Sequence, residues 1–463
     1  MPLPVASAGL SVTIQSPAPA PRWFWGALVL LHLAALLFQL QQRYYLFPDS
    51  DRYLTEAENI VHHGEFYARP PAEPRHPQEY TMRPPGYPLW LAALGTPAGY
   101  VAWALLAQNV LSLLNLAWIT RLVGRYAPPA WGWWLLLTVT FPGQIIYANV
   151  LMSELLLQTA VVGIFASAVA CWERPRARHF AALAGWATLA MFVKPVFYPF
   201  SALVLAAGLW AAWRQRRAVL AALGALPLVL ALLYQGWNAQ RTGYFHFSSI
   251  AEINLLRYNV RAVLRKVEGP EAADRHLDAI IARAGQQPGY AAEQRYIKAE
   301  SSRLLRQHLG AYALIHAQGS VNFFLDPGRF DVVHFLGLPE PPGAGLLARF
   351  STAGGYRAVW AYVRTLPVGL IAGLLLVAAA NALRLLLLLR FLLDRLAPLH
   401  LRVLVAGLLG YVAVLTGPLG AARFAVPVLP LLLVAVPFAL ARWPRLSGPP
   451  RRGAAEKSGG APG

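Results

Sequence analysis

The sequence is poor in acidic residues and in cysteine. Only 21 of its 463 residues are Asp or Glu, against 40 Lys and Arg, and Cys171 is its single cysteine. One cysteine forms no disulfide within the chain, so cysteine usage does not indicate a redox compartment. Charged residues make up 13% of the chain and hydrophobic residues 57%, with a mean hydropathy of +0.44. These values exclude an ordinary soluble domain and indicate a chain that crosses a membrane repeatedly.

The excess of basic residues follows the distribution that is typical of membrane proteins. A net charge of +19 is typical of nucleic-acid binding, but much of the excess lies in short arginine clusters between apolar segments. This is the distribution that the positive-inside rule describes, so we expect these clusters on the cytoplasmic side and no nucleic-acid partner. The clusters include Arg121 and Arg125, then the arginines of 174–178, 214–217, 384–395 and 442–452.

Ten apolar segments predict an all-α polytopic membrane protein. With the N-terminus inside, each arginine cluster falls on the cytoplasmic side. The fifth and sixth segments meet at Lys194-Pro195, where proline ends a helix. Joining these two into one bent segment would invert the topology downstream, and the charge bias argues against it. The predicted segments are 23–42, 99–120, 130–148, 151–172, 179–193, 196–213, 218–236, 358–389, 400–416 and 424–441.

These segments divide the chain into five parts. Residues 1–22 are predicted to be a cytoplasmic tail and residues 442–463 a disordered one. A membrane module occupies 23–236, with its first outer loop at 43–98, and the last transmembrane helices occupy 358–441. Between them, apolar residues in 237–357 recur at helical spacing. We expect amphipathic helices there, either lying on the outer leaflet or packing over the membrane module.

Two acidic residues follow the first apolar segment directly. Asp49 and Asp51 stand in the run DSDRY, and Tyr53 ends it. Acids at the end of a membrane-spanning helix are costly unless something there uses them. The plain alternative is that Ser50 or Asp51 caps a helix that starts near Arg52.

A second feature of the first outer loop is the run RPPGYPLW, which begins at Arg83 and includes Tyr87. Its prolines and glycine predict a rigid turn at the membrane surface. A guanidinium held there is well suited to bind phosphate through two parallel hydrogen bonds. The alternative is an ordinary interfacial anchor.

Three further charged residues stand at predicted outer helix ends. Glu154 begins the fourth segment, Lys194 precedes Pro195, and Arg423 begins the last segment. A carboxylate at a helix N-terminus is favourable in itself, and each cation alone is explained by contact with lipid headgroups. Because these residues share the predicted outer side with Asp49 and Arg83, we expect all five to converge on one face.

The order of these features resembles the GT-C glycosyltransferases, in particular the branch of the protein-O-mannosyltransferases and aminoarabinose transferases. The matching pieces are the runs that begin at Asp49 and Arg83, together with Ser153-Glu154, Lys194-Pro195 and Arg423. The resemblance implies a GT-C-type bundle of about 10 transmembrane helices with juxtamembrane helices on the outer face. It also implies an inverting transfer of a sugar from a polyprenyl-phosphate donor to an acceptor hydroxyl on that face.

The resemblance also implies roles for particular residues. Asp49 falls on the family's acidic position and would be the general base, while Arg83 matches the cation that contacts the donor phosphate. Lys194 and Arg423 match basic positions near that phosphate. Relatives often read Asp-Glu where this chain has Asp49-Ser50, so which acid is the base stays open.

The remaining expectations concern further candidates and partners. Asp51 and Glu154 are additional catalytic candidates, and Tyr53 and Tyr87 are candidates for substrate binding. No cofactor is expected, and whether Asp49 and Asp51 hold a divalent metal stays open. The implied partners are the lipid-linked sugar, a glycan, lipid or protein acceptor, and membrane lipids. The richness in Ala, Leu and Arg points to a bacterial inner membrane, with the site facing the periplasm.

Two other classes of function compete with this interpretation. A transporter or lipid flippase would place ionisable groups near the bilayer midplane, often on broken helices from paired repeats. Here the charges gather at helix ends on one side, and no repeat is evident. A non-catalytic scaffold would have no need to keep Asp49, Arg83 and Glu154 together.

Overall fold

The computed structural model describes residues 19–95, 97–339, 364 and 366–441. Every regular element in these residues is helical, with no strand among them, so the all-α prediction is confirmed. The predicted tails at 1–22 and 442–463 lie outside the described residues, except for 19–22. Outside them too lie 340–357 of the predicted extracytoplasmic segment and 358–363 of the next predicted span.

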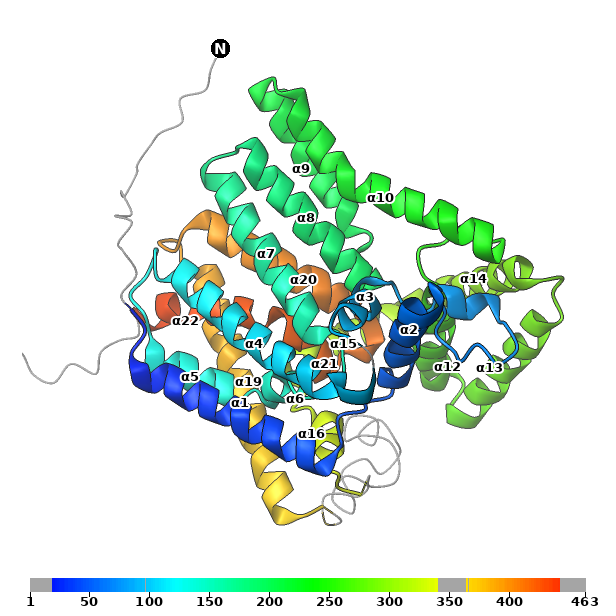
Figure 1. Cartoon of the computed structure of the whole chain (residues 1–463), viewed down its shortest axis with the longest axis horizontal. Coiled ribbons are helices and arrows are strands. Elements are labelled where there is room, and N and C mark those ends of the chain that lie inside the picture. Colours follow the sequence, from blue (N-terminus) through cyan, green and yellow to red (C-terminus); the bar gives the residue numbers. More distant parts are fainter. Residues whose placement is uncertain (1–18, 96, 340–363, 365, 442–463) are drawn as a thin grey trace, which may run out of the picture.

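The membrane part is a bundle of apolar helices (Figure 1). Within the described residues, seven helical segments are long and apolar enough to cross a membrane, and the apolar helices α8 and α20 are shorter. The chain is therefore an integral membrane protein. The helices of this bundle are α1 (Arg22–Gln42), α4 (Pro97–Val123), α5 (Trp131–Val139), α6 (Pro142–Ile146), α7 (Glu154–Glu173), α8 (Ala177–Val193), η2 (Pro195–Phe197), α9 (Phe200–Gln215), α10 (Ala218–Thr242), α19 (Val368–Leu393), α20 (Leu399–Leu415), η4 (Gly417–Leu419), α21 (Ala422–Ala425), η5 (Val426–Val428) and α22 (Leu429–Ala441).

The segment predicted to span at 130–148 is not one helix. It divides into α5 and α6, with Pro142 at the start of α6. The break frees acceptors that a continuous helix would use, and Arg384 of α19 binds them. Its guanidinium donates to the Leu137 carbonyl oxygen at 2.5 and 3.1 Å and to the Thr140 hydroxyl at 2.8 Å. Arg384 was predicted as part of an arginine cluster between spans, but its side chain is 3% exposed and binds groups inside the bundle. Its assignment to the cytoplasmic side stays a prediction.

The break predicted at Lys194-Pro195 is confirmed. Helix α8 ends at Val193, Lys194 is extended with φ −139° and ψ 125°, and η2 starts at Pro195. Proline disfavours helical backbone at the residue before it, which explains why Lys194 leaves the helix. Lys194 therefore lies in an extended link between α8 and η2 and not within a helix.

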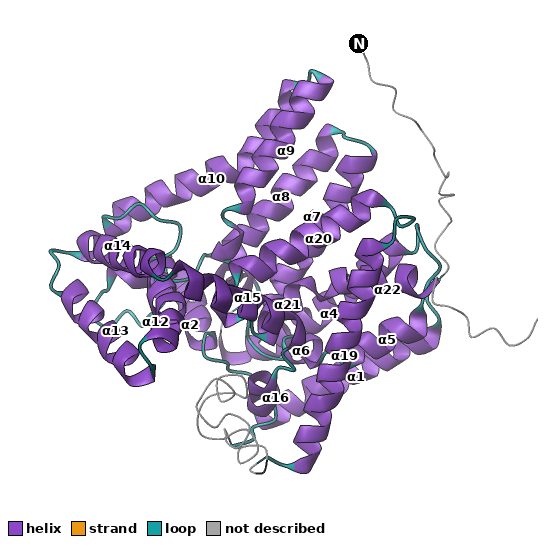
Figure 2. Ribbon diagram, turned by 180° about the vertical axis from the view of Figure 1, so that it is seen from behind, coloured by secondary structure: helices purple, strands orange, loops and turns teal. Residues whose placement is uncertain are grey.

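The first outer loop folds into three short helices: α2 (Ser50–His63), η1 (Pro77–Tyr80) and α3 (Gly86–Ala93). Beyond α10, the chain forms further helices. Among them, α12, α13 and α14 gather beside one end of α10 (Figure 1 and Figure 2), whereas α15 and α16 pack against the bundle and contribute Phe323 and Phe335 to the main core. These further helices are α11 (Ile250–Asn254), the π-helical stretch η3 (Leu255–Val260), α12 (Arg261–Val267), α13 (Pro270–Gly285), α14 (Tyr290–Gln307), α15 (Leu309–Leu325) and α16 (Arg329–Phe335).

The amphipathic helices predicted after α10 are present, but their apolar faces pack on one another. Leu256, Leu264, Leu277 and Ile297 belong to a small core shared by η3 and α12–α14, separate from the main core. The helical stretch is interrupted at His308, which separates α14 from α15. This group of helices therefore has a buried interior of its own, which these apolar side chains fill.

Candidate active site

Five charged side chains from distant parts of the sequence meet in one network. Asp49 accepts from Arg83 Nη2 through Oδ1 at 2.5 Å and from Arg423 Nη2 through Oδ2 at 2.7 Å. Glu154 Oε1 accepts from Arg423 Nε and from Lys194 Nζ, each at 3.1 Å. Arg423 therefore bridges the two carboxylates, and we call these five residues the ion-pair network.

Asp49 reaches this network because it does not cap the helix that follows it. Helix α2 begins at Ser50 with Asp49 in the N-cap position, yet no side-chain capping bond forms. Ser50 instead ties the junction to the rest of the fold: its hydroxyl accepts from the Phe47 amide and donates to the Leu151 carbonyl. Capping by Ser50 or Asp51 is thereby excluded as the explanation of this motif, and the Asp49 carboxylate is left for the arginines.

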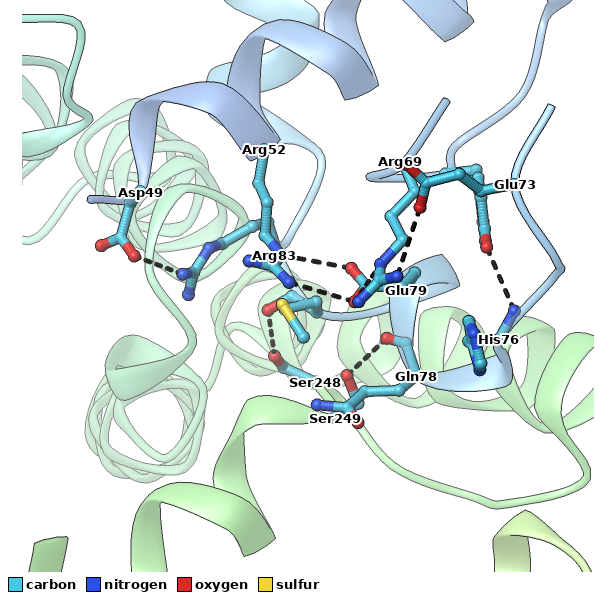
Figure 3. Close-up of polar contacts among 12 residues, drawn as sticks. Asp49, Arg52, Arg69, Glu73, His76, Gln78, Glu79, Arg83, Ser248 and Ser249 are labelled. Atoms are coloured by element: carbon cyan, nitrogen blue, oxygen red, sulfur yellow. Dashed lines mark hydrogen bonds and ion pairs between the residues drawn. The ribbon is translucent and has the colours of Figure 1, made fainter. Parts of the chain in front are cut away.

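Arg83 is held by its surroundings on several sides. Its guanidinium lies 5.7 Å from the centre of the Tyr53 ring, and the side chain is 13% exposed. Figure 3 shows it beside Asp49, next to a second set of pairs in which Glu79 accepts from Arg52 and Arg69. Because Arg52 belongs to α2, these pairs fix the loop that precedes Arg83 to that helix.

The turn after Arg83 approaches α8 closely. A Cβ on Gly86 would lie 2.6 Å from the carbonyl oxygen of Phe192, so only glycine fits there without a backbone shift. Phe192 is two residues before Lys194 in the chain. This backbone contact therefore sets the position of Arg83 relative to Lys194.

Glu154 and Arg423 come from the starts of two other helices. Glu154 occupies the first turn of α7, where the helix dipole favours negative charge, and its side chain is 3% exposed. Arg423 lies in α21, directly after a turn in which Gly420 has φ +35°. Gly420 packs against the backbone of Gly319 in α15, so the turn that delivers Arg423 depends on two glycines meeting.

The electrostatics of the network favour anions. Burial alone would raise the pKa of Asp49, but Arg83, Arg423 and Lys194 outweigh it and hold that pKa well below its usual range. Three cations thus face two carboxylates, so the network carries one positive charge in excess. An uncompensated charge in a partly buried site is costly, and an anion bound there would reduce that cost.

The other predicted site residues lie at different places. Asp51 is exposed and forms no ion pair with any described residue. Tyr53 and Tyr87 are buried at 2% and 0% exposure. Tyr53 shares a hydrogen bond with the Ser153 hydroxyl at 3.2 Å, and Tyr87 donates to Gln108 Oε1 at 2.7 Å. Both tyrosines are therefore buried packing residues beside the network, and the Tyr53 ring lies against the Arg83 guanidinium. Their role in substrate binding stays a prediction.

Sequence reasoning missed two buried acids beside the network. Glu56 is 2% exposed, and burial raises its pKa, with Arg241 and Arg83 opposing that shift. Asp331 of α16 accepts from the Tyr147 hydroxyl at 3.0 Å, and burial raises its pKa to about 7. Glu56 lies seven residues after Asp49 on α2, which places it on the same helix face, and this spacing was the available signal. Nothing in the local sequence marks Asp331.

The described residues offer no clear metal centre. No group of three or more His, Cys, Asp or Glu side chains within them is arranged to hold a metal ion. Both oxygens of Asp49 accept from guanidinium groups, while Asp51 is exposed on α2. The arrangement of Asp49 is thus that of an ion-paired carboxylate.

Comparisons with known proteins give one structural similarity. No protein-family model matches the sequence, and no curated protein matches it. Among solved structures, the chain is similar to the crystal structure of ArnT from Cupriavidus metallidurans bound to undecaprenyl phosphate. The sequences are 16% identical, the similarity covers 90% of this chain and 79% of that chain, and the TM-score is 0.40.

Proposed function

We propose that this protein is a membrane glycosyltransferase that uses a polyprenyl-phosphate-linked sugar. The sugar would pass to an acceptor hydroxyl at the membrane surface with inversion, and Asp49 would act as general base. The observation that carries the proposal is the ion-pair network. It brings three cations and two carboxylates together from the loop between α1 and α4 and from the ends of the apolar helices α7 and α8 and the short helix α21. Arginine and lysine at one point are the side chains that bind phosphate.

In the proposed reaction, the acceptor oxygen attacks the anomeric carbon of the sugar. The bond between that carbon and the phosphate oxygen breaks, and the proton of the acceptor hydroxyl passes to Asp49. Charge develops on the departing phosphate, where Arg83, Lys194 and Arg423 would stabilise it. A positioned general base contributes about 100- to 10,000-fold to such a reaction.

Binding of the donor phosphate would also change the basicity of Asp49, because this carboxylate pairs with both guanidiniums that would bind the phosphate. Bound to Arg83 and Arg423, the phosphate would compete with Asp49 for the same N–H groups. Loss of these partners raises the pKa of a carboxylate and makes it a better base. Asp49 would therefore become an effective base when the lipid-linked sugar is in place.

A groove beside the Arg83 turn fits the lipid part of the donor. Its volume is about 590 Å³, and its lining is apolar, including Trp90, Leu94, Trp103, Leu106 and Val110 from α3 and α4. Helix α3 begins three residues after Arg83. We place part of the isoprenoid chain in this groove, because the phosphate end would then lie at the network.

We further propose that the network faces the outer side of a bacterial inner membrane. The arginine clusters at 121–125 and 214–217 would then lie inside, as the positive-inside rule requires. Single cysteines at positions 51 and 216, in a Cys171→Ser background, test this orientation with an impermeant thiol reagent in intact cells. Labelling at 216 without labelling at 51 would reverse it.

The decisive experiment measures cleavage of the lipid-linked sugar. Purified protein is incubated with a panel of radiolabelled polyprenyl-phosphate sugars and a membrane extract that supplies acceptor hydroxyls, and release of polyprenyl phosphate is followed. We expect release by the wild type and a loss of about 100-fold or more in Asp49→Asn. A transporter or flippase would move the lipid without breaking the sugar–phosphate bond, so intact donor throughout the panel, together with lipid translocation in vesicles, would replace the proposal.

A further inference from the structure

A second groove opens at the other end of the bundle. It has a volume of about 620 Å³ and lies where α1 begins, α4 ends and α5 begins. These helix ends lie together in Figure 1, away from α2 and α3. Trp25, Trp118 and Trp131 contribute to its wall, and Arg121 and Arg125 lie along it. We call it the end groove.

The end groove is rich in hydrogen-bond donors and has no acidic residue in its lining. Arg121 is exposed and pairs with no described residue. Arg125 has a long contact with Glu173, at 3.4 Å. None of the three indole N–H groups donates to a described residue, whereas Trp134 nearby donates to the Leu433 carbonyl. Arg121 and the three indole N–H groups therefore have no acceptor among the described residues, and Arg125 has only the long contact with Glu173.

The aromatic walls are held in place before any ligand binds. The Trp131 ring packs at a tilt against Phe24 and edge-on against Trp134, at centroid distances of 5.1 and 5.0 Å. Trp118 packs on Trp186 at 5.7 Å. Rings that are already ordered lose little side-chain entropy on binding, which favours a ligand that lies against them.

The end groove lies about one membrane thickness from the ion-pair network. Helix α1 has 21 residues, so its length is roughly 30 Å, about the thickness of the hydrocarbon core. The network lies just beyond its end at Gln42 and the end groove at its beginning. A ligand in the end groove therefore belongs to the opposite leaflet and does not touch the candidate active site.

We propose that the end groove binds the headgroup of an anionic glycerophospholipid from the leaflet opposite the network. A lipid phosphate supplies the acceptor oxygens that Arg121 and the indole N–H groups lack among the described residues, and it offers Arg125 a closer partner than Glu173. Indole rings are typical of the membrane–water interface, and basic pockets between transmembrane helices bind lipid headgroups. None of the described lining residues is acidic, and the ion pair of Glu173 is with Arg125, so the charge of Arg121 favours an anionic headgroup over a zwitterionic one.

The test uses the full-length protein in detergent and native mass spectrometry to count bound lipid. The probe is phosphatidylglycerol, with phosphatidylcholine and undecaprenyl phosphate as comparisons. We expect phosphatidylglycerol to bind more tightly than phosphatidylcholine, and Arg121→Gln to weaken phosphatidylglycerol binding about tenfold or more, because a charged hydrogen bond is lost. Undecaprenyl phosphate bound at the ion-pair network should be unaffected by Arg121→Gln. The matched control is Arg214→Gln, which removes the same charge from an exposed arginine at the end of α9 and should leave the affinity unchanged.

Three results would overturn the proposal. Equal weakening by Arg121→Gln and Arg214→Gln would show diffuse attraction to a basic surface. Equal affinity for phosphatidylcholine and phosphatidylglycerol would show that the groove does not distinguish headgroups by their net charge. Preferred binding of undecaprenyl phosphate that Arg121→Gln abolishes would assign the groove to the lipid carrier. A melting curve from tryptophan fluorescence verifies that each variant is folded, and Arg121→Lys, which keeps the charge, should recover part of the binding.

Discussion

Arg423 is the residue whose replacement tests the ion-pair network most directly. Its guanidinium joins Glu154 through Nε at 3.1 Å and Asp49 through Nη2 at 2.7 Å. Lysine keeps the charge but offers one compact ammonium group on a shorter reach, so Arg423→Lys holds one carboxylate and loses the other. A hydrogen bond to a charged group contributes about 1.5–3 kcal/mol. We therefore expect the free energy of unfolding to fall by about 2 kcal/mol.

The matched comparison is Arg83→Lys. Arg83 pairs with Asp49 alone, and its Nε is buried without a hydrogen-bond partner. Lysine can keep that single pair, and it removes the unpartnered N–H, so this variant should lose about 1 kcal/mol or less. Both values come from denaturant titration in detergent, followed by tryptophan fluorescence without substrate. A loss in Arg83→Lys equal to or greater than that in Arg423→Lys would refute the bridging role of Arg423.

Three further predictions concern catalysis, pH and packing. Asp49→Asn should lower the rate of polyprenyl phosphate release about 100-fold or more while donor binding persists, and Asp51→Asn, at an exposed position, should retain most activity; the reverse pattern would make Asp51 the base. Because burial raises the pKa of Asp331 to about 7, the folded state holds a proton that the unfolded state releases near pH 4, so this residue's contribution to stability falls as pH rises toward 7. Asp331→Asn should therefore raise the melting temperature more at pH 8 than at pH 5, and an equal rise at both would contradict this. Gly86→Ala should cost about 1–3 kcal/mol of stability, because its Cβ would collide with the backbone of α8, whereas Gly26→Ala, with open space around it, should be neutral by the same melting assay.

The sequence predicted those features of the fold that depend on residues close together in the chain. Apolar runs of spanning length predicted the helices, and the proline after Lys194 predicted the end of α8. The break between α5 and α6 was missed because the apolar run 130–148 is long enough for one span, although Pro142 within it was a local signal of a break. Its interruption is supported by Arg384, more than 200 residues away in the chain. Hydropathy does not report such a distant partner.

The same limit applies to the candidate site. Isolated charges at helix ends brought Asp49, Arg83, Glu154, Lys194 and Arg423 to attention, and the structure places all five together. Their pairing was not predictable, since it depends on how four separate segments pack. The burial of Tyr53 and Tyr87 was not predictable either, because an aromatic residue near an interface has the same sequence pattern whether it faces substrate or core.

The length of chain between Asp49 and Arg423 has a consequence for biogenesis. The two residues are 374 positions apart, so Arg423 leaves the ribosome long after the other members of the network. Until then Arg83 and Lys194 balance Asp49 and Glu154, and the nascent site is electrically neutral. The last spans supply the surplus positive charge, so an incomplete chain in the membrane would not draw lipid phosphates into an unfinished site.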